Sequence, residues 1–391
     1  MMDFFIDVSS DSLNKYGEEL CGDKVEVIRT EDSIIIVLAD GLGSGVKANI
    51  LATLTTKIAG TMLKSGVSIY ETVDTIANTL PVCNVRKLAY STFAIIKIDS
   101  NYNASIFEYD NPPLFFIRNG KHIELNKREI IMNDKKVKQS TIRLEEGDCV
   151  TLVSDGVIHA GVGGFLNLGW QWGNVCNYME RQSYMEKCSK NISKNLIETC
   201  KSLYADKPGD DTTAVTVRVR KAEYIDLFTG PPEDKEDDNF VVRQLMKGNG
   251  KKIVCGGTAA KIVSRELDEE LVVNLDFIDP DVPPTAKING IDLVTEGVLT
   301  LSKTVEKIKK HINFFHDENT AYMLKGEDGA SKLAKILIED CTHLNLWVGK
   351  AVNPAHQNPS LPIDLSIKLK VVKELAQLME GMGKITNITY I

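Results

Sequence analysis

The sequence of 391 residues predicts an α+β protein in which a sandwich of β-sheets flanked by helices precedes a second, smaller α/β domain. Three observations favour this fold class. Strand-like runs and paired helical segments fill residues 1–222. A proline-rich, acidic stretch over residues 223–240 is expected to be a solvated linker. Over residues 241–391, strand-like and helical segments alternate, as is typical of an α/β domain.

The predicted first domain opens with strands and a pair of helices. Apolar, β-branched runs predict strands over residues 4–8, 24–30 and 34–38. Apolar side chains recur at helical spacing along residues 46–63. Ser68, with Glu71 three residues later, has the pattern of a capping box that starts a second helix. We expect both helices to flank the sheets.

More strands and a second group of helices complete this domain. Strand-like runs occupy residues 91–98, 104–109, 114–118 and 149–153. Asn119-Gly120 predicts a hairpin turn that leads into residues 122–125. Residues 171–181 and 190–204 are expected to be helical, and an alternating strand over residues 213–219 closes the domain.

The second domain is expected to contain a partly parallel sheet. Its predicted strands are residues 252–254, 271–275, 291–294 and 343–348. A first helix is expected between the first two of these strands and ends at residue 267, and further helices are expected over residues 302–310, 327–338 and 366–381. Cys255-Gly256-Gly257-Thr258 joins the first of these strands to a helix. This segment is either a tight turn between strand and helix or a cradle for an anion such as a nucleotide phosphate. Binding of a small ligand by the second domain is therefore left open.

Composition excludes several classes of partner. A net charge of −8 argues against nucleic acid bound through its phosphates. No apolar run approaches the ~20 residues of a membrane span, and no basic and apolar leader opens the chain. The eight cysteines include no Cys-x-x-Cys pair and are expected to be reduced thiols. We therefore expect a cytoplasmic protein without a membrane partner.

Aspartates at the ends of apolar runs are the candidate functional residues. Asp40-Gly41 follows one such run and Ser154-Asp155-Gly156 follows another, while Gly22-Asp23 and Asp210-Asp211 lie beside strands. Converging carboxylates stay ionised only when a divalent cation neutralises them. Ligands that are all oxygen, without His or Cys, favour Mg²⁺ or Mn²⁺ over zinc.

The order of these motifs resembles that of metal-dependent type 2C serine/threonine protein phosphatases. The similarity is greatest to their bacterial branch, the stage II sporulation protein E family, and covers about residues 1–220. It implies a four-layer α-β-β-α sandwich and two or more Mn²⁺ or Mg²⁺ ions. The catalytic residues that it implies are Asp23, Asp40, Asp155 and Asp210. The implied metal ligands are Asp23, Asp40, the Gly41 carbonyl, Asp155, Asp210 and Asp211.

Several roles stay open at this point. Asp211 is either a ligand or the cap of the turn that follows it. Lys15 either steers a phosphate or is a solvated lysine. Leu42 stands where many eukaryotic relatives carry histidine, so a metal-bound water or His159 would protonate the leaving group, although His159 is also compatible with a simple turn.

The function expected from the resemblance is hydrolysis of phosphoserine or phosphothreonine on a regulatory protein by water activated between two metal ions. Anti-anti-sigma-like proteins are the substrates that the family implies, and a homodimer is left open. The alternative is a catalytically weak signalling or binding module whose C-terminal domain senses a ligand.

Overall fold

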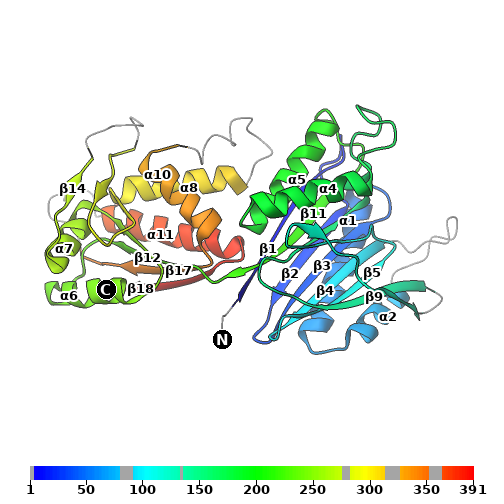
Figure 1. Ribbon diagram of the computed structural model, residues 1–391, viewed down its shortest axis with the longest axis horizontal. Helices are drawn as coiled ribbons and strands as arrows, with labels where there is room; N and C mark the ends of the chain where they lie inside the picture. The colour runs from blue at the N-terminus through cyan, green and yellow to red at the C-terminus, as the bar shows by residue number, and fades with distance from the viewer. Residues whose placement is uncertain (1–3, 80–90, 133–134, 275–281, 313–325, 352–362) are drawn as a thin grey trace. The chain divides into compact units, whose positions relative to one another are not determined.

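The computed structural model describes residues 4–79, 91–132, 135–274, 282–312, 326–351 and 363–391. The chain divides into two compact units, Met1–Lys221 and Ala222–Ile391, which are described separately (Figure 1). Among the described residues, no helix is both long enough and apolar enough to cross a bilayer.

Two antiparallel sheets form the centre of the first unit. The first sheet has the strand order β1-β11-β10-β6-β7 and the second has the order β2-β3-β4-β5-β9-β8. The strands of the first sheet are β1 (Phe4–Leu13), β11 (Thr212–Lys221), β10 (Cys149–Val153), β6 (Phe115–Arg118) and β7 (Lys121–His122). Those of the second are β2 (Asp23–Arg29), β3 (Ser33–Gly41), β4 (Ser91–Asp99), β5 (Asn103–Tyr109), β9 (Lys135–Arg143) and β8 (Arg128–Met132).

Alternation along β3 shows how the layers pack. Ile36 and Leu38 enter the core between the two sheets, whereas Ile35 and Val37 face the helices α1 (Gly45–Lys64) and α2 (Ile69–Thr79). On the outer face of the other sheet, α4 (Trp172–Met185) and α5 (Ser189–Leu203) pack over a third apolar cluster. The expected α-β-β-α sandwich is confirmed, and its layers can be followed in Figure 1.

Local signals in this unit also behave as the sequence predicts. The Ser68 hydroxyl accepts a hydrogen bond from the Glu71 N–H at 3.1 Å, as a helix cap does. Asn119 and Gly120 have φ of 53° and 74° between the antiparallel strands β6 and β7, which confirms the hairpin.

The second unit is built on a mostly parallel sheet, with the strand order β14-β15-β16-β13-β12-β17-β18. Strands β16, β13, β12, β17 and β18 run parallel to one another, whereas β15 pairs antiparallel with both β14 and β16. The expected partly parallel sheet is therefore confirmed. The strands are β14 (Val272–Val273), β15 (Ala286–Lys287), β16 (Leu293–Thr295), β13 (Lys251–Cys255), β12 (Tyr224–Thr229), β17 (His343–Val348) and β18 (Ile385–Tyr390).

Helices cover both faces of this sheet. One face packs against α6 (Asp238–Lys247) and α7 (Gly257–Leu267). The other face packs against α8 (Val298–Ile312), α10 (Gly329–Lys335) and α11 (Ile363–Gly381). The second unit is therefore a three-layer α/β structure with its own two apolar clusters.

The prediction of an acidic linker over residues 223–240 is wrong. Strand β12 lies inside that range and pairs with β13 and β17, so it is a central strand of the second sheet. The acidic residues that follow begin helices: Asp234 caps the 3₁₀ turn Lys235–Asp237, and buried Asp238 opens α6. Carboxylates are stabilising at helix N-termini, so the same composition that suits a solvated linker also suits a helix start.

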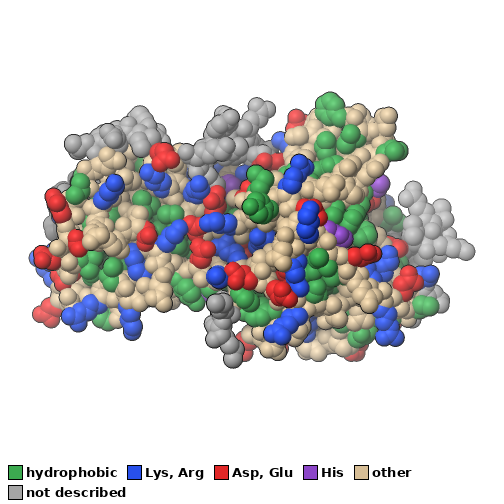
Figure 2. All heavy atoms as spheres, viewed as in Figure 1, with side chains coloured by type: hydrophobic (Ala, Val, Ile, Leu, Met, Phe, Trp, Pro, Cys, Tyr) green, Lys and Arg blue, Asp and Glu red, His purple; other side chains and the backbone are tan. Residues whose placement is uncertain are grey.

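Surface charge agrees with the composition. Lys and Arg side chains are interspersed with Asp and Glu over the visible face of each unit (Figure 2).

Candidate functional site

Two of the predicted aspartates form a cross-strand pair. Asp23 opens β2 and Asp40 lies near the end of β3, and their Cα atoms are direct partners in the antiparallel register. Side chains opposite one another in such a pair project from the same face of the sheet. By the alternation along each strand, Asp40 shares its face with Leu38, and Asp23 shares its face with Val25, which packs against the core between the sheets. The pair therefore lies on the inner face, at one end of the sandwich.

The sheet that contains β10 and β11 supplies further carboxylates to the same end of the sandwich. Asp155 is separated from the end of β10 by Ser154 and is the first residue of the short helix α3 (Asp155–Ile158). Asp211 immediately precedes β11 and is buried, with 4% of its surface exposed. The Ser154 hydroxyl accepts the Thr213 N–H at 2.8 Å, so the two segments are held side by side.

Glycines let these backbones approach one another. A Cβ on Gly156 would lie 2.1 Å from the Asp211 carbonyl oxygen, and one on Gly22 would lie 2.8 Å from Asp211 Oδ2. A Cβ on Gly41 would lie 2.0 Å from the carbonyl oxygen of Ala48 in α1. Steric crowding therefore explains why glycine stands next to the aspartate at each of these three positions, because a larger residue would push the packed segments apart.

Burial and mutual repulsion raise the pKa values of the clustered carboxyl groups. Burial raises the pKa of Asp40 to about 9, and the neighbouring charges of Asp23, Asp155, Asp210 and Asp211 add to the rise. These four aspartates therefore lie near enough to Asp40 for their charges to act on it.

The same effects act on Asp23 and Asp210. Burial raises the pKa of Asp23 to about 7, with additions from Asp211 and Asp155, while the hydroxyls of Ser154 and Thr213 oppose the rise. Burial and Asp155 raise the pKa of Asp210 as well. Buried acids that share a site resist ionisation until a positive charge joins them.

Several buried oxygens in the cluster lack a well-formed hydrogen bond. Both carboxylate oxygens of Asp23 and Oδ2 of Asp211 are buried and accept no hydrogen bond of standard geometry, although the Ser154 and Thr213 hydroxyls lie close to Asp23. Asp23 is only 4% exposed. Buried acceptors are rarely left without a partner, and a divalent cation that prefers oxygen ligands would satisfy them. With the side chains as they stand, the described residues include no group of three His, Cys, Asp or Glu side chains close enough to hold a metal ion.

Asp210 and Asp211 differ in their surroundings. Asp211 Oδ1 accepts the backbone N–H of Lys15 at 3.0 Å. Asp210 has a side chain that is 46% exposed, accepts the Asp211 N–H at 3.0 Å, and lies 3.9 Å from Lys15 Nζ. Asp210 is therefore at the rim of the cluster and Asp211 is in its interior.

The remaining candidates lie outside the carboxylate cluster or at its edge. Lys15 places an ammonium at the rim beside Asp210. His159 caps the end of α3 and is exposed. Glu18, which sequence reasoning did not select, accepts a hydrogen bond from Ser44 at 3.0 Å and so ties the loop after Asp40 to the segment before Asp23. The sequence signal for Glu18 is only its place five residues before Asp23.

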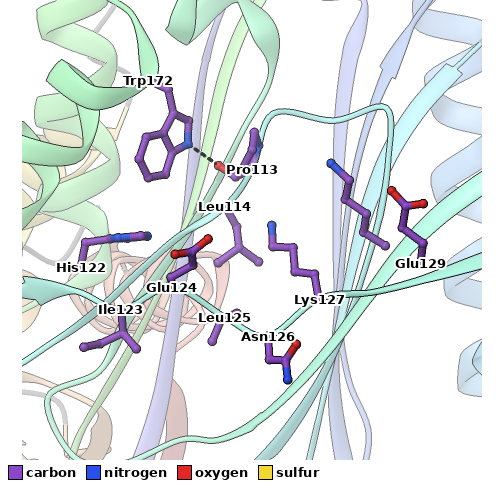
Figure 3. A pocket seen from close by; sticks show the side chains of 11 residues that line it. Pro113, Leu114, His122, Ile123, Glu124, Leu125, Asn126, Lys127, Glu129 and Trp172 are labelled. Atoms are coloured by element: carbon purple, nitrogen blue, oxygen red, sulfur yellow. Dashed lines mark hydrogen bonds between the residues drawn. The ribbon is translucent and has the colours of Figure 1, made fainter.

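A cavity of about 960 Å³ lies elsewhere on the first unit, between residues 113–129 and α4 (Figure 3). Trp172 forms part of its wall and donates its indole N–H to the Pro113 carbonyl at 2.8 Å. Lys127 in the same wall pairs with Glu108 at 2.5 Å. None of the predicted aspartates lines this cavity.

Comparisons with known proteins assign the first unit. Residues 30–220 match the family model described as stage II sporulation protein E. A comparison with curated protein sequences gave no match.

Several solved structures are similar to part of the chain. The PP2C phosphatase domain of Bacillus subtilis SpoIIE, with a fragment of its regulatory domain, is 22% identical with a TM-score of 0.47, and the match covers 56% of this chain and 64% of that one. The RsbU and RsbW domains of a Mycobacterium tuberculosis protein are 16% identical with a TM-score of 0.47, covering 62% and 67%. RsbX in complex with magnesium is 19% identical with a TM-score of 0.42, covering 56% and 100%. The chain thus spans less than two thirds of the SpoIIE structure.

The matched segment contains Asp40, Asp155, Asp210 and Asp211, and it ends one residue before the first unit ends. The second unit lies outside the match. The first unit of this chain therefore belongs to the stage II sporulation protein E family of PP2C-type phosphatase domains.

Proposed function

We propose that the first unit is a metal-dependent serine/threonine protein phosphatase that removes phosphate from a regulatory protein. The observation that carries this proposal is the cross-strand pair of buried Asp23 and half-buried Asp40, with further carboxylates arriving from the other sheet of the first unit. A cluster of this kind is suited to binding hard divalent cations and has no other evident purpose in the fold.

The residues that would hold two Mn²⁺ or Mg²⁺ ions are the carboxylates of the cluster and one backbone carbonyl. They are Asp23, Asp40, the Gly41 carbonyl, Asp155, Asp210 and Asp211. When bound, such ions supply the positive charge that lets water attack a phosphate ester near neutral pH. This chemistry matches a donor set made only of oxygen atoms.

The side chains around the cluster favour water over a protein nucleophile. Burial, with Asp23 and Asp211 nearby, raises the pKa of the Cys21 thiol, so this sulfur stays protonated and is a poor nucleophile. The Ser154 hydroxyl is buried and accepts a backbone N–H. The Lys15 ammonium at the rim would attract the phosphate dianion of a substrate.

The proposed substrate is a phosphoserine or phosphothreonine protein of bacterial signal transduction, of the anti-anti-sigma-like class. Membership of the SpoIIE family supports this class. A phosphoprotein can reach the cluster because Asp210 and Lys15 are partly exposed at its rim.

Phosphate release from phosphoserine, phosphothreonine and phosphotyrosine peptides tests the proposal. We expect turnover of the first two with Mn²⁺ or Mg²⁺ and none after EDTA treatment, since no side chain replaces the metal-dependent water. Asp40→Asn should lower kcat by at least about 100-fold, because it removes a carboxylate from the centre of the cluster.

Glu146→Gln is the matched control. Glu146 is an exposed acid in the turn before β10, at the end of that strand opposite Asp155, so its loss should leave kcat unchanged. Turnover that survives exhaustive chelation would overturn the proposal. Metal binding without turnover of any peptide would instead favour a signalling module that only binds.

A further inference from the structure

A second cavity, of about 710 Å³, lies within the second unit at the carboxyl ends of its parallel strands. The residues that end β12, β13 and β16 are Thr229, Cys255 and Thr295, and the loops that follow these strands line the cavity. Lys368 of α11 completes the wall. This volume lies within the range of small-molecule sites, about 300–1,000 Å³.

The topology of the sheet singles out this edge. From β12 the chain moves outward through β13 to β16, with α6 and α7 on one face of the sheet. It then returns to β17 and β18 on the other side of β12, with α8, α10 and α11 on the opposite face. The strand order therefore reverses between β12 and β17, and ligands of open α/β sheets bind in the crevice at such a reversal.

Three glycines make the floor of the cavity bare backbone. Gly230, Gly256 and Gly297 follow the three strand ends, and a Cβ on Gly256 would lie 3.8 Å from Gly297 Cα and 4.0 Å from the Gly230 nitrogen. Gly230 and Gly256 have φ of +74° and +128°, which side-chain-bearing residues rarely adopt. Backbone of this kind lets a ligand approach main-chain N–H groups closely.

Two helices begin at the cavity without an acidic residue in their first turn. The α7 helix has 11 residues and starts at Gly257, after an N-cap, Gly256, that offers no side chain. The α8 helix has 15 residues and starts at Val298. Both starts line the cavity, and the free N–H groups and dipole of a helix start favour an anion.

Lys368 places a buried ammonium group in the wall of the cavity. Lys368 is only 8% exposed, and its ammonium group donates a hydrogen bond to the Gly349 carbonyl oxygen. Among the acidic residues whose side chains the structure describes, none forms an ion pair with it. The charged lining consists of Lys261, Lys368 and Glu296, so the lysines outnumber the carboxylate. A buried ammonium is costly unless an anion joins it.

We propose that the second unit binds a small organic phosphate, of the nucleoside phosphate class, in this cavity. The phosphate would lie at the N-termini of α7 and α8 beside Lys368. The organic part would lie against Leu299 and Ile367, which are 48% and 39% exposed. This site is separate from the aspartate cluster, so it does not depend on the proposed phosphatase activity.

Calorimetric titration of the full chain with AMP, ATP, adenosine and inorganic phosphate tests this site. EDTA is present throughout, which keeps divalent ions away from the first unit. We expect a nucleotide to bind at one site per chain and adenosine to bind at least about tenfold more weakly, since it lacks the phosphate.

Two variants test whether the nucleotide binds in this cavity. Lys368→Met keeps an unbranched apolar stem and removes the charge. Gly257→Asp adds a carboxylate where a Cβ meets nothing within 4 Å and where an acid suits the helix start. Each should weaken nucleotide binding by about tenfold or more, and Gly257→Asp should do so without lowering the melting temperature. Lys370→Met, an exposed lysine of the same helix, is the control that should leave affinity unchanged.

Three results would overturn the proposal. One is the lack of binding by either nucleotide at millimolar concentration to a folded chain. Another is equal affinity for AMP and adenosine, which would show that the phosphate is not recognised. The third is undiminished nucleotide binding by folded Gly257→Asp, which would place the ligand elsewhere.

Discussion

Asp23 and Asp40 are placed where they reduce the stability of the metal-free protein. They are directly opposite on neighbouring strands, and Asp23 is buried with neither carboxylate oxygen accepting a hydrogen bond of standard geometry. Like charges in such a pair are destabilising, and a buried acceptor without a partner costs about 1–3 kcal/mol. The divalent cations proposed for this site would offset both costs.

Replacing one carboxylate of this pair should therefore stabilise the protein without metal. We expect Asp40→Asn to raise the free energy of unfolding in EDTA near pH 7 by about 1–3 kcal/mol, because the neutral amide replaces an acid whose ionisation is opposed in the folded, metal-free cluster. Added Mn²⁺ should stabilise the wild type and have a much smaller effect on the variant. Thermal unfolding with EDTA and with Mn²⁺ measures both effects.

Glu146→Gln serves as the control for net charge, since it removes one acid at a distant, exposed position. An Asp40→Asn protein that is less stable than the wild type in EDTA would contradict the repulsion argument. One that gains the full stabilisation from Mn²⁺ would show that Asp40 is not a ligand.

Gly41 has a structural role that can be tested separately from the carboxylates. A Cβ there would lie 2.0 Å from the Ala48 carbonyl oxygen, which is backbone and cannot turn aside. Gly41→Ala should therefore destabilise the protein by about 1–3 kcal/mol and lower metal-dependent turnover, because α1 and the end of β3 must separate.

Gly173→Ala is the matched control for this glycine. Gly173 lies near the start of α4, and nothing lies within 4 Å of the position of its Cβ. Alanine there should be neutral or stabilising by up to about 1 kcal/mol. Chemical denaturation of both variants decides the point, and equal stability of Gly41→Ala and the wild type would refute the packing argument.

Strands with strong apolar alternation could be predicted from the sequence, and polar edge strands could not. Strand β3 has buried apolar residues on both faces, so its pattern is unmistakable. Strand β9 is polar along most of its length and buries only Val137 and Ser140, so no periodicity reveals it. Strand β18 lies at the edge of its sheet with exposed positions along it.

The candidate site was predictable in part for a similar reason. Aspartates that follow apolar runs are expected at the ends of strands, and the resemblance of their motif order to that of the type 2C phosphatases implied that the five belong to one site. That Asp211 is interior and Asp210 is at the rim depends on how β11 meets the segment before β2, which only the folded chain shows.

Strand β12 sets where the chain can be divided. It pairs on both sides within the second sheet, and its apolar Ile225, Leu227 and Phe228 are fully buried there. A fragment of residues 1–221 should therefore be soluble and folded. A fragment of residues 1–229 should aggregate, since it exposes an unpaired apolar strand. Size-exclusion chromatography and circular dichroism compare them, and equal solubility of the two would contradict this boundary.

The whole chain combines two units with separate apolar cores. The clusters of the first unit and those of the second share no residues. Every proposed metal ligand lies in the first unit, and the cavity proposed for an organic phosphate lies in the second. This arrangement suits a catalytic unit joined to a regulatory one.

Removing residues 222–391 should therefore affect two kinds of substrate differently. On p-nitrophenyl phosphate with Mn²⁺, we expect kcat/KM of residues 1–221 to stay within about threefold of the full chain, because the ester needs only the carboxylate cluster. On a phosphoprotein the change should be larger, since a protein substrate also depends on contacts and regulation outside the reacting centre. Steady-state kinetics of both forms on both substrates makes the comparison. A fragment that is folded by circular dichroism yet inactive on the small ester would place necessary residues in the second unit, and the separation of catalysis from regulation would be wrong.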